Sequence, residues 1–365
     1  MGVKNNRFNV RSSWWDSYVS GKSKAYNTGQ LGSTHPGAYG VSGGTEITPG
    51  DGYVYHFFTT AGSEETLTNN DPTKSAEYVI IGGGGAGGNG PDTGNYRAAG
   101  GGGSGLYRSG PITLSTGVGY KLYVANGAPQ TSGPDGAAPY PTTTGGRGGD
   151  GENSWLVDPT AGISSITSAG GGGGGGGANT PVGRYTGQDG GSGGGSGGYG
   201  PGTKGTGSGV DYPGSPPSLP SPTDGWGNDG GTSDGSNGGG GGGASSVGGP
   251  GAGTYKGGDG IAAFNGSTGI PPAYGTPGPT AGRWFAAGGG GGTRPTASAN
   301  VQPGGVGGGG AGGWNHGGPQ RYGIPGTTNT GSGGGGTGGD NYPATEANGL
   351  GGAGAPGIIM IRYPA

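Results

Sequence analysis

The chain has 365 residues, of which 111 are glycine, while 26% are hydrophobic and 10% are charged. This composition excludes an ordinary globular protein with a large apolar core, and the net charge of −3 excludes the basic surface typical of nucleic-acid binding. The lack of cysteine excludes disulfides and thiolate metal sites. No apolar run approaches the roughly 18–20 residues that span a bilayer, so we expect no membrane insertion.

The first 42 residues differ from the rest because they are basic and aromatic and contain few strand signals. They set several lysines and arginines against the single acid Asp16. Such a segment is typical of an arm that docks on a partner, and the alternative is a terminal arm that wraps its own domain. The anchoring candidates are Arg7, Arg11, Trp14 and Trp15. We therefore divide the chain into an N-terminal anchoring arm, residues 1–42, and a folded region, residues 43–365.

Short apolar segments follow along the folded region, rich in Ile, Val, Tyr, Phe and Trp and bounded by Gly, Pro or Asn. This pattern is typical of β-strands. It predicts strands near 53–60, 76–81, 106–125, 154–168, 261–264, 283–286 and 358–363. No stretch shows the helical spacing of apolar residues over three turns, so we predict an all-β chain with no substantial α-helix.

Glycine runs follow several of these strands, as where Ile81 passes directly into Gly82–Gly85, and one run, Gly170–Gly177, is unbroken. A collagen triple helix is excluded because its glycine recurs at every third position. The remaining ordered arrangement is the polyglycine-II helix, which has three residues per turn and no internal hydrogen bonds. Its N–H and C=O groups must therefore pair sideways with neighbouring helices. We predict that the glycine-rich insertions pack as a polyglycine-II helix bundle.

The order of strands and glycine runs also predicts how the chain is arranged. Four glycine-rich excursions leave strands and return to them, at residues 82–105, 126–152, 170–260 and 288–357. If the strands form one antiparallel β-sandwich, all four leave from the same end. We predict a small β-sandwich root that carries the four excursions, and the longest excursion must have structure of its own because it exceeds any ordinary loop.

Four features of the folded region together resemble the glycine-rich tail fibre and receptor-binding (adhesin) proteins of tailed bacteriophages. They are Tyr53-Val-Tyr-His-Phe-Phe58, Ala76-Glu-Tyr-Val-Ile-Ile-Gly-Gly-Gly-Gly85, the repeated Ser/Thr-Ala-Gly-Gly-Gly runs and Gly357-Ile-Ile-Met-Ile-Arg-Tyr363. Such proteins are frequent in phages of marine bacteria and cyanobacteria. The chain is more distantly similar to the adhesin tips of T-even-type phages, where variable loops at the apex of a polyglycine-II bundle bind the host. The resemblance covers residues 43–365.

The resemblance implies a virion protein that is assembled in the bacterial cytoplasm, released by lysis and attached to other virion proteins through residues 1–42. It also implies that loops between the glycine runs contact a host cell-surface glycan or outer-membrane protein, where Tyr and Trp give rigid contact area. The receptor-binding candidates are Tyr185, Tyr212, Trp226, Trp314, His316, Arg321, Tyr322 and Tyr342, of which Trp226, Trp314 and Tyr322 are expected at the outermost pole. The alternative is that some of these rings shield the edge of the bundle.

Two functions remain open at this stage. The first is host attachment by a tail fibre tip or receptor-binding subunit. The second is a purely structural role as a capsid-decorating fibre or cement protein. Phage fibres are commonly homotrimers, so the resemblance implies either a homotrimer here or a monomer that sits on a trimeric shaft.

Motifs that suggest enzymes carry little weight in this chain. Gly82-x-Gly84-x-x-Gly87 has the letters of a dinucleotide fingerprint, but Gly-Asn-Gly-Pro91 follows where a helix is needed to hold a pyrophosphate. The acids are scattered, and the oxygen-rich stretch 228–235 favours solvated turns over a calcium loop because no repeat supports one. His56 lies within a predicted strand and is interpreted as structural. We expect no catalytic residue, cofactor or metal.

Overall fold

The computed structural model describes residues 40–90, 97–130, 146–157, 166–177, 184–198, 202–209, 225–251, 253–294, 301–314, 321–339 and 349–365. The chain divides into two compact units, Met1–Gly40 and Val41–Ala365. Of the first unit, the structure describes only Gly40. The anchoring candidates Arg7, Arg11, Trp14 and Trp15 lie outside the described residues.

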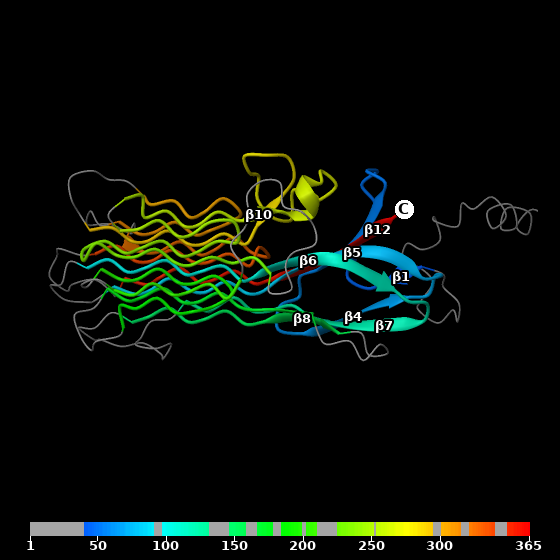
Figure 1. Ribbon diagram of the computed structural model, residues 1–365, viewed down its shortest axis with the longest axis horizontal. Coiled ribbons are helices and arrows are strands. Elements are labelled where there is room, and N and C mark those ends of the chain that lie inside the picture. The colour runs from blue at the N-terminus through cyan, green and yellow to red at the C-terminus, as the bar shows by residue number, and fades with distance from the viewer. Residues whose placement is uncertain are drawn as a thin grey trace, which may run out of the picture. The chain divides into compact units, whose positions relative to one another are not determined.

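The predicted all-β antiparallel fold is confirmed: the unit contains two five-stranded sheets whose neighbouring strands all pair antiparallel (Figure 1). The first sheet has the order β1 (Val41–Ser42), β4 (Glu64–Asn69), β7 (Val118–Tyr123), β8 (Ser154–Val157) and β9 (Ile166–Ser168). The second has the order β2 (Thr45–Ile47), β3 (Tyr53–Phe58), β12 (Ile358–Pro364), β5 (Lys74–Ile81) and β6 (Tyr107–Leu114). Among the described residues there is no α-helix, and no helix is long and apolar enough to cross a membrane.

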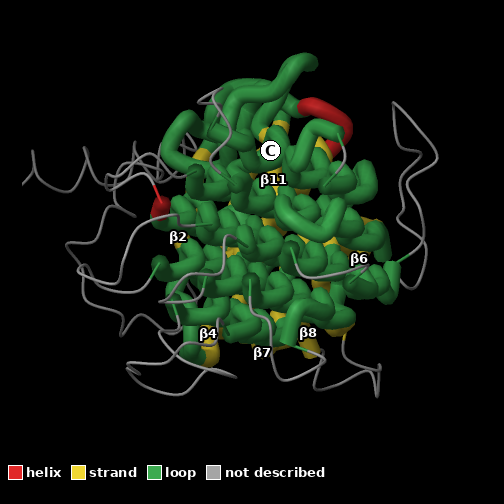
Figure 2. Tube along the Cα trace, turned by 90° about the vertical axis from the view of Figure 1, so that its left-hand side faces the viewer, coloured by secondary structure: helices red, strands yellow, loops and turns green. Residues whose placement is uncertain are grey.

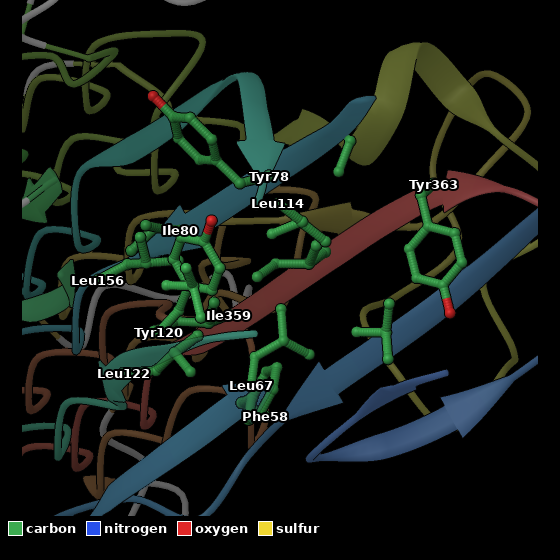
Figure 3. Close-up of a cluster of buried hydrophobic side chains, with 14 of the residues drawn as sticks. Phe58, Leu67, Tyr78, Ile80, Leu114, Tyr120, Leu122, Leu156, Ile359 and Tyr363 are labelled. Atoms are coloured by element: carbon green, nitrogen blue, oxygen red, sulfur yellow. The ribbon is translucent and has the colours of Figure 1, made fainter. Parts of the chain in front are cut away.

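The two sheets enclose one hydrophobic core (Figure 3). Side chains on alternate positions of a strand share a face, so Ile359, Ile361 and Tyr363 of β12 point into this core with Ile80 of β5. The first sheet contributes Leu67 among others. The remaining members include Phe58, Tyr78, Leu114, Tyr120, Leu122 and Leu156.

The opposite face of the second sheet is also covered, which makes β12 buried on both sides. Ile358 and Met360 of β12 pack there in a second core with Trp226, Phe264 and Phe285. This outer layer includes a two-stranded sheet of β10 (Ile261–Ala262) and β11 (Trp284–Phe285) and a 3-10 turn at Ala263–Gly266. Burial on both faces explains why the end of β5, 78–81, and the start of β12, 358–361, are continuous apolar runs.

The sequence does not predict β4, because Leu67 is the one apolar side chain in Glu64-Glu-Thr-Leu-Thr-Asn69. The structure pairs β4 with β7 along its whole length and buries Leu67 completely. Pairing and one buried leucine therefore form a strand that composition alone does not reveal.

Glycine-rich segments extend from the sheets and lie side by side (Figures 1 and 2). The segment 82–89, which continues β5, shows how they pair. Its N–H groups donate in turn to the carbonyls of three neighbouring segments. Gly82, Gly85 and Gly88 donate to Leu106, Gly103 and Gly100 (3.3, 2.9 and 2.9 Å), and Gly83, Ala86 and Asn89 donate to Glu152, Gly149 and Gly146 (3.0, 2.9 and 2.8 Å). Gly84 and Gly87 donate to Ala355 and Gly352 (both 2.9 Å). Every third residue thus faces the same neighbour, which is the repeat expected of a helix with three residues per turn.

The carbonyls of the same segment accept from further neighbours. Gly83, Ala86 and Asn89 accept from Gly171, Gly174 and Gly177; Gly85 and Gly88 accept from Gly334 and Thr337; Gly84 accepts from Ala128. Segment 82–89 is therefore bonded on all sides by backbone, as sideways pairing of glycine runs requires.

Most interior positions are glycine because there is no space for a side chain there. A Cβ atom on Gly102 would overlap the carbonyls of Gly85 and Ala86, both of them backbone atoms. We call the assembly of these laterally bonded segments the glycine bundle, and the end away from the sheets its far end.

The longest excursion, 170–260, is not one extended loop. It runs forward and back along the bundle several times, and its described passes are 169–177, 184–190, 191–198, 202–209, 225–234, 236–244, 246–251 and 254–260. Consequently its midpoint in sequence is not its outermost point in space, which changes the position of Trp226.

Candidate functional site

The far end of the bundle brings together residues that are distant in sequence. Asn89 is bonded to Gly146 and Gly177, so the outgoing segments that start at Ile81 and Ser168 finish side by side. With the polyglycine-II rise of about 3.1 Å per residue, the step from Ile81 to Asn89 would place this end roughly 25 Å from the sheet.

One group of candidates lies at this end around Trp314. Trp314 forms a β-bridge with Thr293, and Gly338 packs against the Trp314 backbone. The Gly338 N–H donates to the carbonyl of Arg321 (3.0 Å), which holds the next segment in place. Trp314, Arg321 and Tyr322 are half-buried.

Arg321 and Tyr322 also contact each other through their side chains. A guanidinium nitrogen of Arg321 donates to the Tyr322 hydroxyl at 3.4 Å, and the guanidinium carbon lies 5.3 Å from the centre of the Tyr322 ring. Cation–π contact of this kind orients both side chains.

A second group lies at the same end around Tyr185. The carbonyl of Tyr185 accepts from Gly197 (2.7 Å) and the carbonyl of Arg184 accepts from Gly176 (2.7 Å), so the backbone of both residues is fixed by the bundle. Tyr185 is half-buried. The structure thus brings Tyr185, Trp314, Arg321 and Tyr322 to the far end.

Sequence reasoning missed one aromatic residue near this end. Tyr255 has a φ of 46°, a left-handed conformation that is uncommon for a residue with a large side chain. Asn237 donates its side-chain amide to the Tyr255 hydroxyl (3.1 Å), and Asp234 accepts from that amide (2.8 Å). Partial burial and the nearby Asp234 raise the pKa of Tyr255. Nothing in Gly-Thr-Tyr-Lys-Gly257 marks this residue in the sequence.

Trp226 does not belong to the far end, so that prediction is wrong. It forms a β-bridge with Tyr107 at the start of β6, and the two rings lie 5.8 Å apart. Trp226 is 2% exposed and belongs to the core between the second sheet and its outer layer. The reason is the repeated reversal of excursion 170–260, because Trp226 begins an outgoing pass instead of ending one.

Tyr212, His316 and Tyr342 lie outside the described residues. His56 has the structural position that its strand predicts. Its Nδ1 lies 2.8 Å from the Gly43 carbonyl and its Nε2 lies 3.3 Å from the Tyr363 hydroxyl. Burial lowers the pKa of His56, although the Gly43 carbonyl and Glu46 act in the opposite direction.

The acids of the bundle bind backbone amides. Asp229 accepts from the N–H of Gly207 (2.9 Å) and pairs with Lys204 (2.9 Å). Partial burial opposes its charge, but the bonds from Lys204 and Gly207 outweigh that effect and lower the pKa of Asp229. Asp234 accepts from the N–H groups of Ser236 and Asn237 within a turn. Among the residues that the structure describes, no group of acids or histidines is arranged to hold a metal ion.

The letters of the dinucleotide fingerprint at Gly82, Gly84 and Gly87 belong to a laterally bonded segment of the bundle. Their N–H groups donate to neighbouring carbonyls and do not form the start of a helix. The dinucleotide site therefore lacks the element that would bind its phosphates.

A shallow recess of about 320 Å³ opens on the side of the bundle. It is lined by Arg147, Gly148, Gly149, Asp150 and Gln188. Desolvation raises the pKa of Asp150, against the opposing effect of the Gly173 N–H that it accepts (2.8 Å).

No family model matches this chain, and no curated protein is significantly similar to it.

Proposed function

We propose that this protein is a tail fibre tip or receptor-binding subunit of a tailed bacteriophage and attaches the virion to its host. In this proposal the β-sheets are the root, the glycine bundle is a stiff spacer with the polyglycine-II conformation, and the far end makes the contact. The three-residue repeat of lateral hydrogen bonds supports the assignment of that conformation.

The observation that carries the proposal is the convergence of aromatic and arginine side chains at the far end. Tyr185, Trp314 and the adjacent pair Arg321 and Tyr322 come from three passes of the chain, and the backbones of Tyr185, Trp314 and Arg321 are bonded to or packed against a neighbouring glycine segment. Residues held on a rigid element lose little conformational entropy on binding, and Tyr, Trp and Arg dominate contact energies at interfaces.

The proposed partner at this end is a host cell-surface glycan or outer-membrane protein. Residues 1–42 would dock on other virion proteins, since they concentrate basic and aromatic residues. We propose no enzymatic step for this protein.

Adsorption of phage that carry altered copies of the chain tests the proposal. Replacing Trp314 and Tyr322 together with Ala is expected to weaken adsorption at least tenfold, since loss of one interfacial hot spot costs about 2 kcal/mol or more. The matched control is Trp155→Ala, which removes a half-buried Trp from β8 of the root. Adsorption that is unchanged in both variants would contradict host attachment and favour a capsid-decorating or cement protein.

A further inference from the structure

The sides of the glycine bundle pose a problem that its interior does not. A segment inside the bundle is surrounded by neighbours that accept its N–H groups, whereas a segment at the side lacks a neighbour on one face among the residues that the structure describes. An unpaired row of N–H groups is a template for adding another chain, as at the edge of a β-sheet.

Segment 169–177 shows how one such face is completed. Two of its rows of N–H groups donate to backbone: Gly171, Gly174 and Gly177 to Gly83, Ala86 and Asn89, and Gly172 and Gly175 to Ser192 and Gly195. The third row consists of Gly170, Gly173 and Gly176. Gly176 donates to the carbonyl of Arg184 (2.7 Å), but Gly170 and Gly173 donate to the side chains of Asn153 (2.9 Å) and Asp150 (2.8 Å).

The spacing of these side chains matches the spacing of the missing backbone acceptors. Arg147, Asp150 and Asn153 are three residues apart, so in a helix of three residues per turn they share one face. Arg147 donates to the side chain of Gln188 at 3.4 Å, and Gln188 donates to the carbonyl of Gly148 at 3.1 Å. Arg147, Asp150 and Gln188 line the recess on the side of the bundle.

The same solution recurs at two other places. The N–H of Thr206 donates to Asp189 (2.7 Å), and the N–H of the adjacent Gly207 donates to Asp229 (2.9 Å). The N–H of Val306 donates to Asp259 (2.7 Å), which Lys256 holds from three residues away (2.7 Å). Carboxylates here substitute for the carbonyls that a further segment would provide.

We propose that the side of the bundle is a latent self-association surface, closed by Asp150 and Asn153, and that a second copy of this chain is the partner they exclude. The partner must offer backbone carbonyls at three-residue spacing without side chains that would prevent close approach. The glycine segments of another copy meet both requirements. The inference does not depend on the attachment function proposed above.

The test is the double variant Asp150→Gly with Asn153→Gly in the full chain, measured by light scattering over a range of protein concentrations. The wild-type mass is expected to be independent of concentration. The double variant is expected to exceed that mass at least twofold as concentration rises, while circular dichroism shows that it remains folded. The control is Asp150→Asn, which removes the charge but keeps an acceptor oxygen and is expected to behave as wild type.

A double variant that keeps the wild-type mass at every concentration overturns the proposal. Equal association of Asp150→Asn overturns it as well, because charge would then be the cause. Hydrogen exchange of the wild-type protein gives a readout that needs no variant to fold. Gly170 and Gly173 are expected to exchange as slowly as Gly171 and Gly174, and exchange at the rate of free amides overturns the proposal.

Discussion

Adding one methyl group inside the glycine bundle tests whether close backbone contact stabilises this protein. In Gly102→Ala the new Cβ meets the carbonyl groups of Gly85 and Ala86, which are backbone atoms and cannot rotate away. In the matched variant Gly149→Ala the nearest atom is the Ala128 Cβ at 3.8 Å, an ordinary van der Waals distance.

The two substitutions therefore differ in packing while sharing the same chemical change. Overpacking of a close-packed interior costs about 1–3 kcal/mol. Shifting the segment also weakens hydrogen bonds such as that from Gly102 to Gly334 (2.8 Å), at about 1 kcal/mol net each. Both variants gain about 0.4–1 kcal/mol because alanine restricts the unfolded chain. Gly102→Ala is thus expected to lower the free energy of unfolding by about 1–3 kcal/mol, and Gly149→Ala to leave it unchanged or slightly raised.

Urea denaturation, followed by circular dichroism of the β-sheets, measures both values under the same conditions. Hydrogen exchange at Gly85 and Gly334 reports whether the loss is local to the bundle. Equal stability of the two variants would refute the reasoning, because the interior would then have space for a Cβ atom at Gly102 that the neighbouring carbonyls exclude.

Two further predictions concern the root. Trp226→Ala is expected to lower the free energy of unfolding by about 3–5 kcal/mol, the range for removing a buried Trp, and to leave adsorption intact below the unfolding temperature; adsorption lost from a protein with wild-type stability would return Trp226 to the contact surface. The pKa of His56 is lowered by burial. Below the ordinary histidine pKa of about 6.5, the unfolded chain therefore binds a proton at this residue that the folded chain does not bind. The contribution of neutral His56 to the free energy of unfolding is therefore complete above pH 6.5. It falls as the pH decreases below that value, by up to about 1.4 kcal/mol per pH unit. Urea titrations at pH 7.5 and 5.5 are expected to show this loss in the wild type and a smaller one in His56→Gln, and equal losses in the two proteins would contradict the assignment.

The strands that sequence reasoning located are those whose composition reflects burial on both faces. Ile80 and Ile81 of β5 and Ile358 to Ile361 of β12 are apolar without interruption because both faces of the second sheet are covered. β4 was not located because one face is exposed and its inner face contains a single large apolar residue, Leu67. Its position depends on pairing with β7, which local composition does not encode.

The residue types of the candidate site could be predicted from the sequence, whereas their positions in the bundle could be predicted only in part. Trp314 follows the glycine-rich stretch 307–313, which ends at the far end, so its place follows from chain order. Trp226 lies between Gly225 and Gly227, and the number of reversals between Gly170 and Gly260 decides which end it occupies. Reversals depend on which neighbours bond each pass, and that information is spread over the whole bundle.

The polar side chains of segment 146–153 illustrate a pattern that was present in the sequence and was not recognised. Asp150 and Asn153 appear scattered when they are read as possible catalytic or metal-binding groups. With a repeat of three residues they fall on one face, and the structure shows each accepting a backbone N–H there. A test for polar residues at this spacing beside glycine would have found them.

The central position of β12 sets an order for biosynthesis. Residues 358–364 lie between β3 and β5, which the ribosome produces some three hundred residues earlier. Until translation has reached Pro364, β3 and β5 have no strand between them, and the second sheet remains divided into two halves. The unpaired edges of β3 and β5 are open to aggregation throughout that interval, and the pairing of β12 with both strands completes the second sheet.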